Sequence, residues 1–82
     1  MNEKDKLTER VRSLLAEAFD VPVEEISTEL AFGDLPQWDS LGHMEVMVRL
    51  EEQFGVEISA ETIAELISVD AICSYLEARL HV

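Results

Sequence analysis

The stretch that decides the fold is residues 38–55, WDSLGHMEVMVRLEEQFG. Asp39 and Ser40 are both good helix N-cap residues, because their side-chain oxygens can accept the free backbone N–H groups of a first turn. Gly55 supplies the kind of stop at which many helices end. The stretch therefore predicts one helix of about four turns, with a serine hydroxyl at its positive end.

The apolar residues of this helix divide into a core face and a border. At 100° per residue the core face collects Val46, Met47, Leu50 and Phe54, and the border collects Leu41, Met44 and Val48. Together they span more than the ~100° stripe that a core-facing helix needs. Two interpretations follow: either the helix is packed on two sides in a small bundle, or the border residues, which have acids beside them, bind a partner.

Length and composition restrict the class of protein. A chain of 82 residues is expected to form a single domain, residues 1–82, and its 48% apolar content argues against disorder. No apolar run approaches the ~18 residues that span a bilayer, and no basic segment precedes an apolar stretch as in a secretory signal. The simplest interpretation is a cytoplasmic chain without membrane insertion. Cys73 is the only cysteine, which rules out an internal disulfide.

Charge is the strongest bulk signal, because the formal net charge is −12. Of the six basic residues, only Arg49 and Arg79 lie beyond residue 12. Such a surface repels nucleic acid, whose binding requires Lys and Arg, and it attracts basic protein partners at low salt. The plainer alternative is that the charge serves solubility alone.

The rest of the chain predicts three more helices. A first helix over residues 2–19 presents Leu7, Val11, Leu14, Leu15 and Ala18 on one face. It should stop near Asp20, because Pro22 disfavours helical geometry at the residue before it. A short helix over 60–66 follows Ser59, and a last helix over 69–79 follows Ser68. Residues 21–37 form a long connection that is expected to pack its apolar side chains over the bundle and to contain a short helical turn.

These elements predict an all-α antiparallel four-helix bundle, with three long helices, one short helix and one long connection between the first two long helices. The most buried side chains are expected to be Leu14, Leu50, Phe54, Ile72 and Leu76. No catalytic or metal-binding constellation is found: the two histidines, His43 and His81, and the single cysteine show no metal-ligand spacing. His43 is interpreted as a half-exposed residue of a first turn, and the chain is not expected to be an enzyme.

The order Asp-Ser-Leu at 39–41, apolar residues with acids between them, and Leu-Glu-Glu-Gln-Phe-Gly at 50–55 resembles the acyl carrier protein family. The three-residue motif is weak alone, but an acidic chain with four predicted helices and a long first connection strengthens it. The resemblance covers about residues 7–80. It implies that Ser40 carries a 4′-phosphopantetheine arm, taken from coenzyme A by a phosphopantetheinyl transferase, with Asp39 and Leu41 as its neighbours.

The resemblance also implies how the chain would work with other proteins. The arm would hold an acyl group as a thioester, and apolar side chains of the second and last long helices would shelter part of it. Basic acyl-transfer, ligase or synthase enzymes would grip the helix after Ser40, and the carrier is expected to act as a monomer. The helix positions implied in this contact are Met44, Glu45, Val48, Glu51 and Glu52.

Two residues depart from the pattern of the fatty-acid type, in which an acid usually follows Ser-Leu. Here Gly42 and His43 follow, and Gly42 would serve close approach of the arm or a partner. The departures favour a specialised fatty-acid, polyketide or lipid-modification pathway. Two alternatives stay open: an aminoacyl, peptidyl or D-alanyl-type carrier, and a cofactor-free acidic adaptor bundle.

Overall fold

The computed structural model describes residues 2–81, which fold into four α-helices and one short 3-10 helix. The elements are α1 (Glu3–Phe19), η1 (Val23–Glu25), α2 (Ser40–Phe54), α3 (Ala60–Glu65) and α4 (Val69–Leu80). Residues 2–81 contain no strand, only an isolated bridge between Ala31 and Ser68. The predicted all-α fold with three long helices, a short one and a long first connection is confirmed.

Local capping signals explain where the helices begin. The side chains of Asn2, Asp39, Ser59 and Ser68 each accept a backbone N–H three residues ahead, at the starts of α1, α2, α3 and α4. Gly55 ends α2 with a φ of 67°, a left-handed conformation that costs glycine little. These boundaries agree with the sequence because a cap depends only on residues within one turn.

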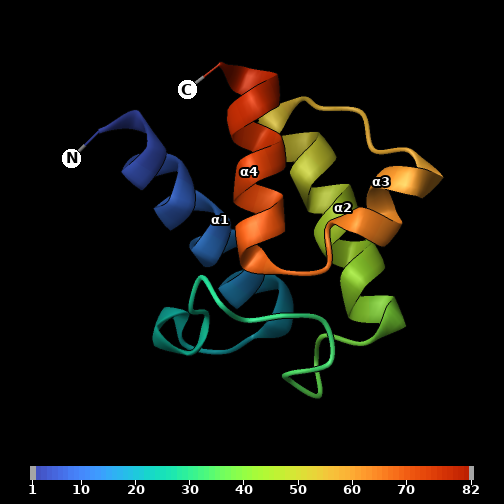
Figure 1. Ribbon diagram of the computed structural model, residues 1–82. Helices are drawn as coiled ribbons and strands as arrows, with labels where there is room; N and C mark the ends of the chain where they lie inside the picture. The colour runs from blue at the N-terminus through green and yellow to red at the C-terminus, as the bar shows by residue number, and fades with distance from the viewer. Residues whose placement is uncertain (1, 82) are drawn as a thin grey trace.

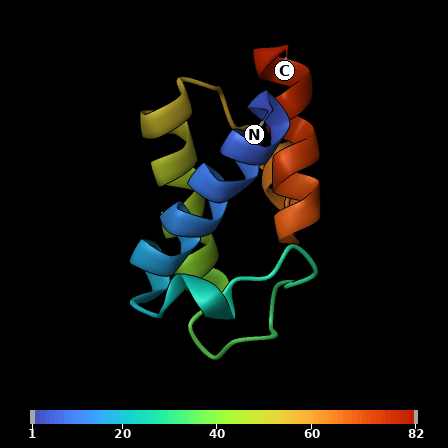
Figure 2. The ribbon, with the colours of Figure 1, turned by 90° about the vertical axis from the view of Figure 1, so that its left-hand side faces the viewer.

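Figure 1 shows α1 running in the opposite sense to α2 and α4, which run in the same sense as each other. The prediction of an antiparallel bundle is therefore wrong for this pair. The reason is that residues 55–68, including α3, carry the chain back along the bundle before α4 begins. α1 packs against both α2 and α4 and crosses in front of them in Figure 2.

The core lies between α1, α2 and α4 and extends into the long connection. The residues that are fully excluded from solvent include Val11, Leu15, Ile26, Trp38, Val46, Leu50, Val69, Ile72 and Leu76. Four of the five side chains expected to be most buried are so, and Phe54 is the exception. It is only half-buried, because it sits at the last turn of α2, where the Arg10 guanidinium lies 4.3 Å from its ring centroid.

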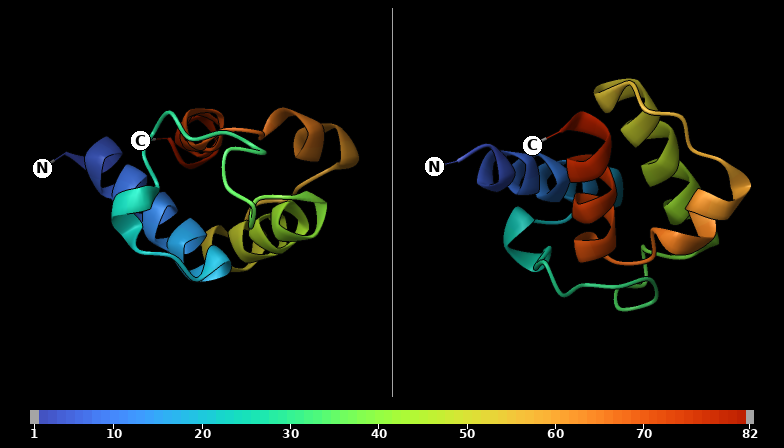
Figure 3. Two further views of the ribbon diagram at one scale, coloured as in Figure 1. Left: turned by 90° about the horizontal axis from the view of Figure 1, so that it is seen from below. Right: turned by 45° about the horizontal axis from the view of Figure 1, so that its top comes forward.

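The connection between α1 and α2 is tied to the bundle at both ends. Arg12 of α1 donates from Nε to the Ile26 carbonyl and from Nη2 to the Val23 carbonyl, 3.1 Å away. Farther along, Phe32 N–H donates to Ile67 O at 2.8 Å, and Val69 N–H donates to Leu30 O at 2.9 Å. The connection thus crosses the end of the bundle beneath α4, as the view from below in Figure 3 shows. The expected short helical turn is η1.

No helix within residues 2–81 combines the length and apolar character that crossing a membrane requires.

We expect Leu50→Ala to lower the free energy of unfolding by about 2–5 kcal/mol, because it opens a cavity in a fully buried site. Phe54→Ala removes more atoms, but it should cost less, since its ring is already partly in water. Equilibrium urea denaturation of both variants measures the two losses in free energy of unfolding. A larger loss for Phe54→Ala would contradict the placement of the core.

Candidate functional site

The first turn of α2 leaves the Ser40 hydroxyl free. Asp39, not Ser40, is the N-cap: its Oδ1 accepts the Gly42 N–H at 2.9 Å. The first N–H groups of a helix have no partner within the helix, so those of Ser40 and Leu41 remain open to an acceptor. An exposed hydroxyl therefore stands at the positive end of a helix of 15 residues.

A cavity of about 280 Å³ adjoins Ser40 on the side of α3. Its lining consists of Phe32, Ser40, His43, Met44, Ile63, Ala64 and Ile67. The connection, α2, α3 and the turn before α4 each contribute to it, and no residue of α4 does. The expectation that the last helix would shelter cargo beside the arm is therefore not met at this cavity.

His43 is buried, with only 6% of its surface exposed, so the interpretation of a half-exposed first-turn residue is wrong. The Trp38 indole Nε1–H donates to His43 Nδ1 at 3.0 Å, and His43 Nε2 lies 2.8 Å from the Ile63 carbonyl oxygen. An indole nitrogen can only donate. The neutral ring therefore carries its proton on Nε2 and donates it to Ile63. This chain of two hydrogen bonds joins the connection, α2 and α3.

Aromatic rings surround the same histidine. The Phe32 ring meets it edge-on at a centroid distance of 5.6 Å, and Trp38 stacks on it at 6.2 Å with 30° between the ring planes. Trp38 also contacts Phe19 of α1, at 5.6 Å between centroids. Losing His43 would leave the buried indole N–H without its partner, at a cost of about 1–3 kcal/mol.

Gly42 has a packing role. A Cβ at this position would overlap the Gln37 carbonyl oxygen and would approach the Gln37 carbonyl carbon to 3.2 Å and the Phe19 ring to 3.3 Å. We expected this glycine to serve close approach of the arm or of a partner. The group that approaches it is instead the chain's own connection, which passes over the first turn of α2. Only a residue without a side chain lets Trp38 reach His43 in this arrangement.

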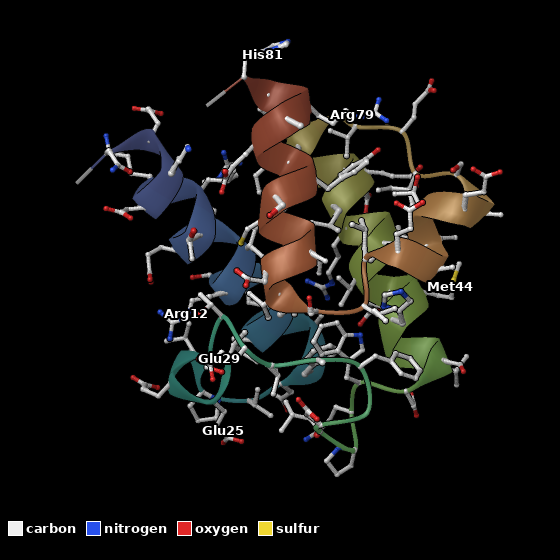
Figure 4. All side chains as sticks on the ribbon, in the orientation of Figure 1. Arg12, Glu25, Glu29, Met44, Arg79 and His81 are labelled. Carbon is white, nitrogen blue, oxygen red and sulfur yellow. The ribbon has the colours of Figure 1, made fainter. Side chains whose placement is uncertain are left out.

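The exposed face of α2 carries the predicted partner strip. Leu41 is 83% exposed, Met44 46% and Val48 49%, and Met44 projects from the edge of the molecule in Figure 4. A groove of about 550 Å³ runs along this face, lined by Met44, Glu45, Val48, Arg49, Glu52 and Gln53.

Glu51 lies outside this groove. Its Oε2 accepts the Ile58 N–H at 3.2 Å, so this carboxylate stabilises the segment between α2 and α3. Arg49, the one basic residue in the groove lining, lies 3.8 Å from a Glu45 oxygen and 3.9 Å from a Glu17 oxygen. Within residues 2–81 no cluster of histidine, cysteine and carboxylate side chains is suited to a metal ion.

Comparison with known proteins decides the family. The sequence model described as the phosphopantetheine attachment site matches residues 9–76. Acyl carrier protein 3 of Ralstonia nicotianae is 35% identical over 72 residues, which cover 88% of this chain and 83% of that protein. The chain belongs to the acyl carrier protein family.

Further similarities extend over nearly the whole carrier. The acyl carrier protein of Thermosynechococcus vestitus is 31% identical over 80 residues, covering 98% of each chain. The solved structure of the Enterococcus faecalis acyl carrier protein superimposes with a TM-score of 0.71 at 27% identity, covering 92% of this chain and 95% of that one. Membership gives the carrier its cofactor, a covalently attached 4′-phosphopantetheine, and its role, which is that of a carrier and not of an enzyme. Its partners in that role are a phosphopantetheinyl transferase and acyl-handling enzymes.

The Gly42→Ala carrier should be less stable by about 1–3 kcal/mol, the usual cost of forcing atoms into a packed site. This loss would come in spite of the roughly 1 kcal/mol by which alanine is the better helix former. Thermal melting followed by circular dichroism measures it. Ser40→Ala, two residues away and exposed, is the matched control and should melt close to the parent. A Gly42→Ala carrier that is more stable than the parent would contradict the close approach of the connection.

Proposed function

We propose that Ser40 is the residue that carries the phosphopantetheine arm. The observation that carries this proposal is that Asp39, and not Ser40, caps the first turn of α2. Asp39 caps the helix, so the adjacent hydroxyl is free, exposed and next to an apolar cavity. The open N–H groups of Ser40 and Leu41 suit the oxygens of a phosphodiester. When bound, the arm supplies a thiol that holds the acyl group as a thioester.

The cavity supports an uncharged acyl cargo over an aminoacyl one. Its seven lining residues, all within residues 2–81, include no carboxylate that could pair with the ammonium group of an amino acid. An ammonium group in this pocket would have no ionic partner among the lining residues. The cofactor-free adaptor is disfavoured because the family match spans most of the chain. Gly42 packs against Gln37 of the connection, and His43 lines the cavity. These two departures from the fatty-acid pattern favour a specialised acyl pathway.

Attachment is tested by incubating the apo protein with coenzyme A and a broad-specificity transferase. The intact mass should rise by that of one arm, and Ser40→Ala should abolish the gain. A gain that persists in Ser40→Ala would refute Ser40 as the attachment residue.

Thiol titration gives a second measurement. Burial raises the pKa of the Cys73 thiol, a hydrogen bond with Thr8 lowers it, and Glu77 and Asp70 raise it further. This buried thiol is therefore protonated at neutral pH and reacts slowly. The native apo protein and Ser40→Ala should show no rapidly reacting thiol. The holo protein should show one, that of the arm.

The same helix carries the surface proposed for docking. Leu41, Met44 and Val48 form an exposed apolar strip that begins beside Ser40, and Glu45 and Glu52 line the groove along it. A partner with a basic patch around a small apolar contact fits this surface. Rim charges mainly govern the rate of association. A second copy of the chain on this strip would block partners, so the carrier is proposed to act as a monomer.

Glu45→Lys should slow arm attachment by about three- to tenfold at low salt, because it reverses a charge that steers the partner. The difference should shrink as salt is added. Initial rates across a salt series measure this, and melting checks that the fold is intact.

Glu25→Lys is the matched control, because Glu25 is exposed and lies across the molecule from Met44 in Figure 4. It makes the same change in net charge. If Glu25→Lys slowed attachment as much as Glu45→Lys, net charge alone would act, and α2 would not be the docking face.

A further inference from the structure

Three hydrogen bonds span Ser40 and close the first turn of α2 around it. The Asp39 carboxylate accepts the Gly42 N–H at 2.9 Å, and the Asp39 carbonyl accepts the His43 N–H at 2.8 Å. The third bond runs between side chains, from the Trp38 indole N–H to His43 Nδ1 at 3.0 Å. Each bond joins residue 38 or 39 to residue 42 or 43, so the serine lies inside a closed loop.

The side-chain bond of this loop is the one that water cannot replace. Trp38 is fully excluded from solvent and His43 is buried, whereas the carboxylate cap is exposed. The end turn of a helix frays readily when only exposed bonds hold it. Separating Trp38 from His43 would strand the buried indole N–H without a partner, which is strongly disfavoured. This bond therefore fixes the distance between the two ends of the segment that carries Ser40.

Both ends of the segment are also attached to the rest of the molecule. On one side, the Trp38 N–H donates to the Leu35 carbonyl oxygen of the connection at 3.0 Å. On the other side, His43 Nε2 donates to the Ile63 carbonyl oxygen of α3 at 2.8 Å. Ser40 is therefore held in a fixed place relative to the connection, to α3 and to the exposed strip of α2.

Arm attachment makes a strict demand on the geometry of the serine. Ser40 Oγ forms a bond to the coenzyme A phosphorus that bears the pantetheine, the bond from this phosphorus to the adenosine bisphosphate leaving group breaks, and the serine proton passes to a base of the transferase. In phosphoryl transfer the attacking and leaving oxygens lie roughly in line. A misplacement of about 1 Å can cost about 100-fold in rate. A segment that holds the hydroxyl in one place favours such a reaction.

We propose that Trp38 and His43 are positioning residues for arm attachment, which hold the Ser40 hydroxyl in the geometry that the transferase uses. The proposal rests on attachment at Ser40 and goes beyond it, because it names the side chains that make this serine a good acceptor. Both residues act through Ser40. Trp38 is fully buried, and both ring nitrogens of His43 are engaged within the chain, so neither offers a polar group to coenzyme A.

The test measures the rate of arm attachment with coenzyme A and a broad-specificity transferase over a series of carrier concentrations. Trp38→Phe removes the indole donor and keeps an aromatic ring in the core. Its kcat should fall by about tenfold or more, because the hydroxyl is less well placed. Its KM for the carrier should stay within about twofold, because the strip proposed for docking is intact. An unchanged kcat, or a loss confined to KM, would overturn the proposal.

Variants of His43 separate the hydrogen bonds from the volume of the ring. In His43→Gln the side-chain amide can still accept one hydrogen bond and donate another, so most of the rate should be retained. In His43→Leu neither is possible, and kcat should fall as in Trp38→Phe. An equal loss in His43→Gln and His43→Leu would count against the proposal. If Trp38→Phe does not fold, this pair of variants decides the question.

A double variant shows whether the two residues act through one bond. Trp38→Phe combined with His43→Leu should be no slower than the slower of the two single variants, because both changes remove the same interaction. Losses that multiply in the double variant would mean that Trp38 and His43 affect attachment independently, and the shared positioning role would be refuted.

Tyr75→Phe is the matched control for stability. It removes another aromatic donor, whose hydroxyl donates to the Glu57 carbonyl oxygen at 2.9 Å, between α4 and the segment after α2. It should lower the melting midpoint without changing kcat at a temperature where every variant is folded. If kcat fell in Tyr75→Phe as it does in Trp38→Phe, general loosening of the fold would be responsible, and Trp38 would have no special role.

Amide hydrogen exchange in the apo protein reports on the closed turn without the transferase. The Gly42 and His43 N–H groups should exchange about tenfold faster or more in Trp38→Phe, and at the parent rate in Tyr75→Phe. Unchanged exchange in Trp38→Phe would refute the role of the indole bond. A mass gain that persists in Ser40→Ala refutes the proposed function, whereas a gain that depends on Ser40, with unchanged kcat in Trp38→Phe, refutes the positioning role alone.

Discussion

The arrangement around Ser40 depends on a chain of two hydrogen bonds, from the Trp38 indole to His43 and from His43 to the Ile63 carbonyl. It joins three parts of the molecule: the long connection, the start of α2, and the short α3. A helix of six residues is too short to be stable alone. Its position against α2 must therefore come from tertiary contacts, and the hydrogen bond from His43 is a directional one.

Two kinds of contact act in different parts of the molecule. Aliphatic side chains between α1, α2 and α4 provide the non-directional burial that holds the bundle together. The end of the bundle near Ser40 uses directional contacts instead: a side-chain cap, a backbone carbonyl over Gly42, and a histidine with both nitrogens engaged. Directional contacts fix geometry at a site that must present a free hydroxyl and a cavity together. Glu45 and Glu52, which line the groove along α2, lie outside both regions, so changes of charge there are expected to leave the fold intact.

The sequence predicted those features whose causes are local. Asp39, Ser59, Ser68 and Gly55 act within one turn, and they placed the helix boundaries well. The family resemblance directed attention to Ser40, and the structure added the reason why its hydroxyl is free. By contrast, Gly42 and His43 could not be understood from their neighbours in the sequence. Gly42 packs against Gln37, and His43 accepts a hydrogen bond from Trp38. Both contacts form only after the connection has folded over α2.

The remaining differences have the same origin. Helical periodicity assigned Phe54 to the core face correctly in direction, but it could not show that the core ends before the last turn of α2. Capping signals located α4 without giving its direction relative to α2. Periodicity assigns no role to Arg12, yet its guanidinium donates to two carbonyls of the connection. A single polar side chain that anchors a loop leaves no periodic trace in a sequence.

The paired backbone hydrogen bonds at Leu30–Val69 and Phe32–Ile67 divide the long connection into two segments that differ in how they tolerate change. Residues added at the exposed positions 27–29, just before this bridge, would lengthen a surface loop without moving the hydrogen-bonded pairs. Residues added after it would displace Trp38 and Gln37 from the first turn of α2, because the bridge fixes one end of that segment and Asp39 fixes the other. Relatives that differ in the length of this connection are therefore expected to vary on the η1 side, where insertions are compatible with an unchanged cavity.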